Sequence, residues 1–202
     1  MLRVALTGGI GTGKSHVVRL LRHRSVPTVD ADQLARAAVQ PDQPAFAGLR
    51  ARFGADVIAA DGTLDRARLG RLIFADPAAR AVLEALVHPP VRSAIDAWFQ
   101  RCGAFARAPY AVADIPLLFE TRRASAFDRV VVVACDPGIQ LQRVMARDGL
   151  PAADAGRRIA AQLPIAEKVE CADAVITTDG SYAETDRQVA SLCRTLAAVD
   201  GS

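Results

Sequence analysis

Short apolar runs alternate along the chain with longer segments in which apolar residues recur at helical spacing. The apolar runs cover residues 4–7, 27–30, 110–114, 130–134 and 174–177. Strands buried on both faces of a parallel sheet have this continuous apolar character, which is clearest at residues 130–134. The alternation of such strands with helices predicts an α/β domain built on a parallel five-stranded sheet.

The long segment between the second and third runs has helical signals throughout. Asp65 is placed to cap one helix, and Asp76 followed by Pro77 is an N-cap with proline at the first position of the next. Pro89 and Pro90 predict the end of that second helix, and a further helix is expected to reach about Arg101. This segment is too long for a simple crossover, so we interpret residues 35–107 as a helical insertion beside the sheet.

A second helical stretch covers roughly residues 140–172 and opens at Asp136-Pro137, again a cap followed by proline. It is rich in arginine and has the character of a lid, and a last helix is expected from about Ser181 to Val199. We therefore predict a single domain with a core of residues 1–34, 108–139 and 173–202, a helical substrate-binding insertion at 35–107 and a lid region at 140–172.

Composition and charge exclude several classes of protein. Hydrophobic residues make up 51% of the chain, charged residues make up 23%, and the formal net charge is +3. The arginines are scattered and form no basic stripe of the kind typical of a nucleic-acid-binding face, so we expect small anionic substrates and no nucleic-acid partner. No apolar run approaches the ~20 residues of a membrane helix, so we expect a cytoplasmic protein with no membrane partner. The four cysteines show no C-x-x-C spacing, which argues against zinc, and the sequence leaves the oligomeric state open.

The residues after the first strand form a complete phosphate-binding loop. Gly8 to Ser15 match G-x-x-x-x-G-K-[ST] at every fixed position, between a predicted strand and a predicted helix. Glycines let backbone N–H groups turn toward phosphate oxygens, and the following helix adds the positive end of its dipole. Lys14, one of only two lysines among 25 basic residues, is expected to reach the β- and γ-phosphates of ATP, and the Ser15 hydroxyl to bind Mg²⁺. We therefore predict a three-layer P-loop NTPase fold. The residues of the loop expected to bind ATP are Gly9, Ile10, Gly11, Thr12, Gly13, Lys14, Ser15 and His16.

Aspartates stand at the ends of the second and third strands. The carboxyl ends of parallel strands line the ligand crevice of such a fold, so Asp30 or Asp32 can accept the proton of an acceptor hydroxyl during phosphoryl transfer. Asp114 is a candidate Mg²⁺ carboxylate. Each of the three has an ordinary structural alternative, since Asp30 and Asp32 are also suited to cap the next helix and Asp114 to form a turn.

Further motifs follow the phosphate loop in a fixed order. They are D-A-D-x-x-A-R at residues 30–36, D-G-T-L-D-R at 61–66, L-V-H-P at 86–89, P-L-L-F-E at 116–120 and R-I-x-x-Q at 158–162, followed by Lys168 and Ala172-Asp173. Together with the loop, they resemble the dephospho-coenzyme A kinase family over about residues 2–180. Only the phosphate loop is strong by itself, but the ordered set is highly specific.

This resemblance implies a reaction. The γ-phosphoryl group of ATP would move to the ribose 3′-hydroxyl of dephospho-coenzyme A, which is the last step of coenzyme A synthesis. Asp32 matches the general base of the family, and Lys14 with Mg²⁺ would stabilise charge on the transferring group. Arg143 or Arg147 would reach the ATP phosphates from a closing lid that excludes water, although a solvated helix face also explains the two arginines. The residues implied to bind dephospho-coenzyme A are Asp32, Arg66, His88, Pro116, Leu117, Glu120, Gln162 and Lys168.

Two positions depart from the family pattern, and two other functions compete with the one implied. His16 stands where a small hydroxyl residue is usual, and Thr178 stands where asparagine is usual. The same-class alternative is another small-molecule P-loop kinase, acting on a nucleoside monophosphate, a sugar or shikimate, and the ordered motifs argue against it. The different-class alternative is a nucleotide-dependent regulatory switch, which often carries an N-K-x-D motif that this sequence lacks.

Overall fold

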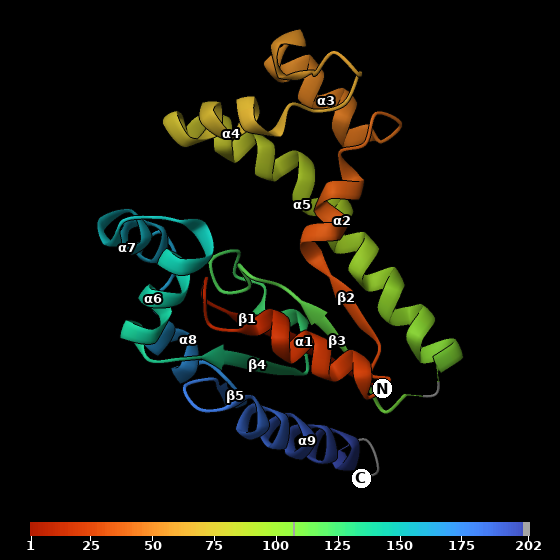
Figure 1. Ribbon diagram of the computed structural model, residues 1–202. Helices are drawn as coiled ribbons and strands as arrows, with labels where there is room; N and C mark the ends of the chain where they lie inside the picture. The colour runs from red at the N-terminus through yellow and green to blue at the C-terminus, as the bar shows by residue number, and fades with distance from the viewer. Residues whose placement is uncertain (107, 200–202) are drawn as a thin grey trace. The chain divides into compact units, whose positions relative to one another are not determined.

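The computed structural model describes residues 1–106 and 108–199 (Figure 1). The chain divides into two compact units, one formed by residues 1–30 with 99–202 and the other by residues 31–98. Residue 107 of the predicted insertion and residues 200–202 of the predicted core lie outside the described residues. The division into core, insertion and lid stays a prediction.

A five-stranded parallel sheet forms the centre of the first unit, with the strand order β2-β3-β1-β4-β5. This confirms the predicted α/β fold and its five strands. Every neighbouring pair is parallel, so the carboxyl ends of all strands lie at one edge. The strands are β1 (Leu2–Gly8), β2 (Thr28–Asp30), β3 (Tyr110–Asp114), β4 (Arg129–Ala134) and β5 (Ala174–Thr177).

One face of the sheet packs against α1 (Lys14–His23) and α9 (Tyr182–Val199), which contact each other (Figure 1). Side chains alternate between the two faces of a strand, so every second residue of β1 and β4 enters this core. The buried apolar residues of the core are Val4, Leu6, Val17, Val18, Leu21, Tyr110, Val112, Val131, Val133, Ile176, Val189, Leu192 and Leu196.

The opposite face carries a different contact, made by Arg3 of β1. Its guanidinium lies 4.8 Å from the ring centroid of Phe99 and 5.9 Å from that of Phe127. Helix α8 (Ile165–Glu170) also contacts β4. Apolar and aromatic groups therefore cover the sheet on both sides, as a three-layer fold requires.

The second unit is helical and has its own small core. It contains α2 (Ala31–Ala38), α3 (Pro44–Phe53), the short helix η1 (Ala55–Val57), α4 (Arg66–Ala75) and most of α5 (Pro77–Arg101). Val39, Ala45 and Leu49 are buried together against Leu83 and Leu86.

The predicted caps of α4 and α5 are confirmed. The Asp65 side chain accepts a hydrogen bond from the backbone N–H of Arg68 at 2.9 Å. Asp76 accepts one from the N–H of Ala78 at 2.8 Å, and Pro77 is the first residue of α5.

The predicted helix end at Pro89 and Pro90 is wrong, because α5 continues through both residues to Arg101. A proline inside a helix removes a backbone hydrogen bond and costs about 3 kcal/mol. Apolar contacts on both sides of the prolines oppose that cost. Leu83 and Leu86 pack into the core of the second unit, and Ile95 and Phe99 are buried.

The predicted helical stretch at 140–172 consists of three helices, α6 (Pro137–Asp148), α7 (Ala152–Ala160) and α8. Helix α6 opens at Asp136 as predicted, since its side chain accepts hydrogen bonds from the N–H groups of Gly138 and Ile139. It ends at Gly149, which has a φ of 65°. The remaining short elements are η2 (Cys102–Ala106) and η3 (Ala124–Ala126). Within residues 1–106 and 108–199, no helix is long and apolar enough to cross a membrane.

Candidate active site

The phosphate loop connects β1 to α1, as its sequence predicts. Strand β1 ends at Gly8 and α1 begins at Lys14. Gly11 has a φ of 77° and Gly13, which is the N-cap of α1, has a φ of 84°. A side chain is strained in this left-handed region, so glycine is required for the loop to turn into the helix. The loop therefore has the backbone that an anion-binding strand–turn–helix needs.

Side chains on neighbouring elements hold the loop from within. Thr12 is fully buried, and its hydroxyl donates to the carbonyl oxygen of Gly9 at 2.8 Å. The Thr178 hydroxyl, beyond the end of β5, donates to the carbonyl oxygen of Thr12 at 2.8 Å. The loop is thus tied both to itself and to the carboxyl edge of the sheet.

Lys14 forms an ion pair with Asp114, the last residue of β3. Only 15% of the lysine side chain and 10% of the aspartate side chain are exposed. In a setting so poorly screened by water, opposite charges interact strongly. The basic group of the loop is therefore held next to the carboxylate at the end of the adjacent strand.

The strand ends bring a second aspartate to the same edge. Asp30 is the last residue of β2 and lies in register with Asp114 of β3, which in turn lies in register with Leu6 of β1. Asp32 follows in the first turn of α2, in the second unit. The parallel sheet thus places Asp30 beside Asp114 at the end of the sheet that carries the phosphate loop.

Arg143 and Arg147, the predicted phosphate contacts on α6, are bound by protein groups. The Arg143 guanidinium donates to the Thr178 hydroxyl at 2.8 Å and to the Thr178 carbonyl oxygen at 2.6 Å. Arg147 donates twice to the neighbouring carboxylate of Asp148, which also accepts from Arg158. Arg143 therefore reaches the same threonine that supports the phosphate loop.

His16, the residue after the loop, has a ring contact and a polar contact. Its Nδ1 lies 2.7 Å from a guanidinium nitrogen of Arg19, and its ring meets that of Tyr182 edge-on with centroids 4.7 Å apart. Burial and the Arg19 charge lower the pKa of the His16 imidazole, and Asp186 opposes this only in part. Since arginine can only donate, Nδ1 is the acceptor and the ring proton sits on Nε2.

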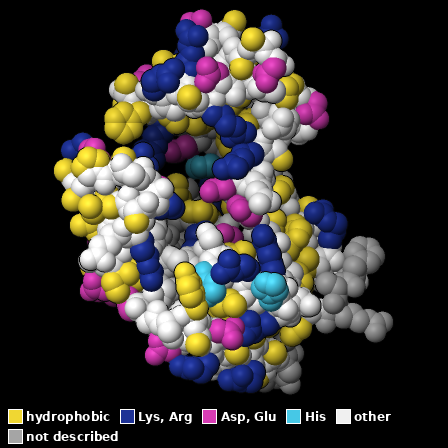
Figure 2. All heavy atoms as spheres, in the orientation of Figure 1, with side chains coloured by type: hydrophobic (Ala, Val, Ile, Leu, Met, Phe, Trp, Pro, Cys, Tyr) yellow, Lys and Arg dark blue, Asp and Glu magenta, His cyan; other side chains and the backbone are white. Residues whose placement is uncertain are grey.

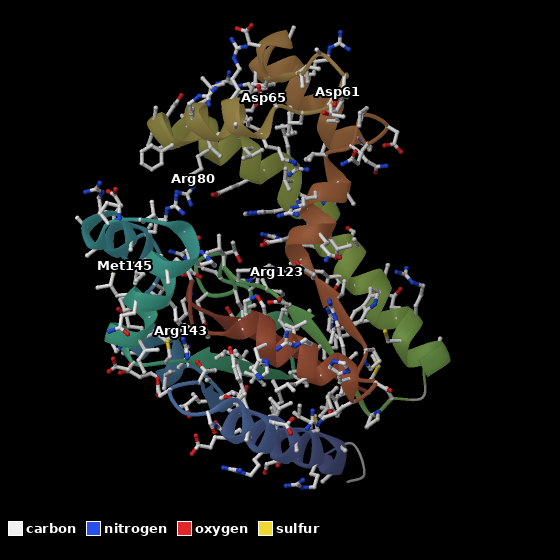
Figure 3. All side chains as sticks on the ribbon, in the orientation of Figure 1. Asp61, Asp65, Arg80, Arg123, Arg143 and Met145 are labelled. Carbon is white, nitrogen blue, oxygen red and sulfur yellow. The ribbon has the colours of Figure 1, made fainter. Side chains whose placement is uncertain are left out.

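The residues implied to bind dephospho-coenzyme A occupy both units. In the second unit, the exposed Arg66 donates to the carbonyl oxygen of Arg36 at 3.3 Å, and the half-buried His88 lies inside α5. Asp65 is the N-cap of α4, and Asp61 lies before it in the connection between η1 and α4 (Figure 3). In the first unit, Pro116 accepts a hydrogen bond from Thr7 through its carbonyl oxygen, and the Leu117 side chain is 39% exposed.

Glu120, Gln162 and Lys168 instead have their polar groups engaged inside the first unit. Lys168 Nζ lies 2.7 Å from Glu120 Oε1, and Lys168 has no exposed surface. Gln162 Oε1 accepts a hydrogen bond from the backbone N–H of Ile10 at 2.7 Å.

Sequence reasoning missed Gln140 of α6, although it contacts the same loop residue. Its side-chain amide is buried and donates to the Ile10 carbonyl oxygen at 2.8 Å. Nothing in the sequence marks this glutamine, since a polar residue on a helix is ordinarily solvated. The sequence marks Thr178 only as a departure from the family pattern, and the structure shows that its hydroxyl supports the loop.

Comparisons with known proteins find relatives over nearly the whole chain. The family model described as dephospho-CoA kinase matches residues 2–184. A dephospho-CoA kinase of Anaeromyxobacter dehalogenans is 48% identical over 193 residues, which cover 94% of this chain and 91% of that protein.

Two solved structures have the same fold. The protein TT1252 from Thermus thermophilus is 34% identical, with a TM-score of 0.84 and 96% of each chain covered. A dephospho-CoA kinase from Campylobacter jejuni is 24% identical, with a TM-score of 0.75 and 98% of each chain covered, and supports the fold alone. The match of the family model to nearly the whole chain shows that this protein belongs to the dephospho-CoA kinase family, whose members transfer phosphate from ATP to an alcohol.

Proposed function

We propose that the carboxyl edge of the sheet is the place where this kinase moves the γ-phosphoryl group of ATP to the ribose 3′-hydroxyl of dephospho-coenzyme A, giving coenzyme A and ADP. The observation that carries this proposal is the ion pair of Lys14 with Asp114, formed beside a complete phosphate loop. The ion pair brings together, at one point of the sheet edge, a lysine suited to bind phosphate and a carboxylate suited to bind Mg²⁺, and phosphoryl transfer uses both kinds of group.

Lys14 and the loop are proposed to bind the phosphates of ATP. The N-terminus of α1 carries the positive end of the helix dipole, and within the described chain its first turn contains no acidic side chain. An anion placed there meets backbone N–H groups and the lysine ammonium together. In the transition state, negative charge spreads over the oxygens of the transferring group, and Lys14 stabilises that charge.

Ser15 and Asp114 are proposed to hold Mg²⁺. Magnesium is usually bound by one or two protein oxygens, with phosphates and water completing its shell. A hydroxyl at the start of α1 and a carboxylate at the end of β3 form a donor set of that kind. When bound, the ion would supply positive charge that offsets the negative charge of the phosphates. Lys14 would exchange part of its contact with Asp114 for contact with phosphate when ATP binds.

Asp32 is proposed to accept the proton of the 3′-hydroxyl. A carboxylate can take this proton only within hydrogen-bond reach of the acceptor oxygen. The position of Asp32 in the first turn of α2, two residues beyond the end of β2, supports this role. Asp30 is the alternative base, because it ends β2 in register with Asp114.

Arg143 and Arg147 are proposed to contact ATP phosphates once the nucleotide is bound. Both guanidinium groups would have to exchange their present partners, Thr178 and Asp148, for phosphate oxygens. Exclusion of water by the lid region at 140–172 would then limit wasteful hydrolysis of ATP.

Arg66, His88, Pro116 and Leu117 are proposed contacts for dephospho-coenzyme A. In the face that Figure 2 shows, basic and acidic side chains are both present. A cytoplasmic location and the absence of nucleic-acid and membrane partners stay predictions of the sequence.

The test is an acceptor screen with the purified protein, ATP and Mg²⁺. Dephospho-coenzyme A, a nucleoside monophosphate, shikimate and gluconate are supplied one at a time, and product formation is followed by mass spectrometry and ADP release. We expect rapid turnover of dephospho-coenzyme A alone, with a 3′-phosphate on the product. Rapid turnover of another acceptor without turnover of dephospho-coenzyme A would overturn the proposal, and ATP hydrolysis indifferent to acceptor would indicate a switch.

A further inference from the structure

Lys168 of α8 is the largest fully buried side chain among the described residues, although it is a lysine. A buried ammonium without a counter-charge is strongly destabilising. Here the counter-charge is Glu120, whose Oε1 lies 2.7 Å from Lys168 Nζ. With no exposed surface, Lys168 has no direct access to a small molecule, so its influence on a ligand has to pass through Glu120.

The same Glu120 oxygen accepts a hydrogen bond from the backbone N–H of Leu163 at 3.0 Å. Burial raises the pKa of the Glu120 carboxyl, but the contacts with Lys168 and the Leu163 N–H outweigh that effect and hold the pKa below its usual value. The carboxylate is therefore charged at neutral pH. The Glu120 carboxylate joins the segment after β3 to the connection between α7 and α8.

Gln162, immediately before Leu163, contacts the phosphate loop. Its Oε1 accepts from the Ile10 N–H at 2.7 Å, while the Gln140 side chain donates to the Ile10 carbonyl oxygen at 2.8 Å. Two glutamines, one in α6 and one in the connection between α7 and α8, thus hold both backbone polar groups of one loop residue. Ile10 lies between Gly9 and Gly11, where the loop has little stiffness of its own.

We propose that Glu120 and Lys168 are positioning residues for the phosphate loop. The ion pair fixes the backbone at Leu163, which fixes Gln162, and Gln162 with Gln140 holds Ile10 in the conformation that receives the phosphates. In this role the three predicted substrate-binding residues Glu120, Gln162 and Lys168 act on ATP binding through Ile10, without touching dephospho-coenzyme A. The inference rests on the proposed function only in that the loop binds ATP.

The direct test replaces Gln162 by methionine, which has a similar length but no amide acceptor. Binding of a non-hydrolysable ATP analogue with Mg²⁺ is measured by calorimetry in the absence of dephospho-coenzyme A, and KM is measured for each substrate. We expect the dissociation constant of the analogue and the KM for ATP to rise about 3- to 10-fold, as for loss of one hydrogen bond. The KM for dephospho-coenzyme A should stay within about 2-fold.

A second variant tests the ion pair without leaving an unpaired buried charge. The double substitution Glu120→Gln with Lys168→Met keeps an acceptor for the Leu163 N–H and keeps the volume of the buried chain. It should weaken analogue binding in the same direction, and adding Gln162→Met should bring little further loss because all three residues act through one contact. Glu167→Gln, an exposed residue of the same helix, is the matched control and should leave both constants unchanged.

Three results would overturn the inference. One is unchanged affinity for the analogue in Gln162→Met. Another is a raised KM for dephospho-coenzyme A with normal ATP binding, which would make these residues substrate contacts. The third is full additivity of the ion-pair and Gln162 effects. Because analogue binding is read without acceptor, a failure of the proposed reaction would show separately, as missing turnover in the unaltered protein. If the double variant does not fold, Gln162→Met alone still decides the inference.

Discussion

Asp32 lies in the first turn of α2, directly beyond the strand end that carries Asp30. The substitution Asp32→Asn keeps the shape of the side chain but removes its capacity to take a proton. We expect turnover to fall by roughly 10²-fold or more, with the affinity for ATP nearly unchanged. Steady-state kinetics with both substrates and nucleotide-binding calorimetry measure the two quantities.

The matched comparison for this prediction is Asp30→Asn. If Asp32 is the base, Asp30→Asn should retain most of the turnover. Near-normal turnover in Asp32→Asn together with a large loss in Asp30→Asn would move the role of the base to Asp30. A loss of ATP affinity in Asp32→Asn would argue against a role confined to the acceptor.

His16 gives a prediction about stability and pH. The pKa of the His16 imidazole is lower in the folded state than its unfolded value of 6.5. At a pH between these two values, the unfolded chain therefore binds more protons than the folded chain. Stability contributed by the neutral ring is therefore present above pH 6.5 and is lost as the pH falls through this range. As the pH falls through this range, the unfolding free energy of the unaltered protein should decrease more than that of a His16→Gln variant, by at most about 1.4 kcal/mol per pH unit.

Urea unfolding between pH 7.5 and 5.5 measures this difference. His23→Gln is the control, since His23 is an exposed residue of the same helix and lacks the contacts of His16 with Arg19 and Tyr182. The unfolding free energy of His23→Gln should depend on pH as steeply as that of the unaltered protein, and more steeply than that of His16→Gln. Identical slopes in the His16→Gln variant and the unaltered protein would show that the imidazole is not held neutral.

At the scale of elements, the start of α6 depends on Asp136. Its carboxylate accepts hydrogen bonds from the N–H groups of Gly138 and Ile139, which have no partner within the helix. Asp136→Ala should lower the unfolding free energy by about 1 kcal/mol, whereas Asp136→Asn should restore most of it because asparagine also caps helices. Chemical denaturation of the three proteins checks the order, and equal losses in both variants would show that the charge matters more than the cap.

The sequence predicts element starts better than element ends. The caps at Asp65, Asp76 and Asp136 involve residues two or three positions apart, so local sequence is sufficient to find them. The passage of α5 through Pro89 and Pro90 depends on packing of its apolar residues, such as Leu86, against residues much earlier in the sequence, such as Leu49. A local rule gives the cost of a proline but cannot give the opposing contribution of tertiary packing.

At the scale of the whole molecule, bound nucleotide should raise the stability of the folded chain. A ligand that binds only the folded state raises the free energy of unfolding by about 2.7 kcal/mol when its concentration is 100 times its dissociation constant. Saturating ATP analogue with Mg²⁺ is expected to raise the melting temperature, and chelation of Mg²⁺ to remove much of the shift. Lys14→Ala should abolish most of the shift and impair turnover, which differential scanning calorimetry and an activity assay measure.

A surface lysine is not available as a matched control, because the chain has only Lys14 and the buried Lys168. Arg22→Ala serves instead, since it removes a positive charge from an exposed position in the last turn of the same helix. A large shift retained in Lys14→Ala, or lost equally in Arg22→Ala, would contradict a specific role of the loop lysine.

The sheet, the phosphate loop and the family could all be predicted from the sequence, because each depends on patterns that are local or follow a fixed order along the chain. The polar groups that support the loop could be identified only from the three-dimensional fold. Gln140, Gln162 and Thr178 follow Ile10 and Thr12 by 130 residues or more and reach them through single hydrogen bonds. The partner of a buried side chain depends on which segments the fold brings together, and no local pattern records it. Lys168 illustrates this limit, because the sequence marks it only as a charged residue near a ligand-binding motif, whereas the structure buries it and pairs it with the carboxylate of Glu120.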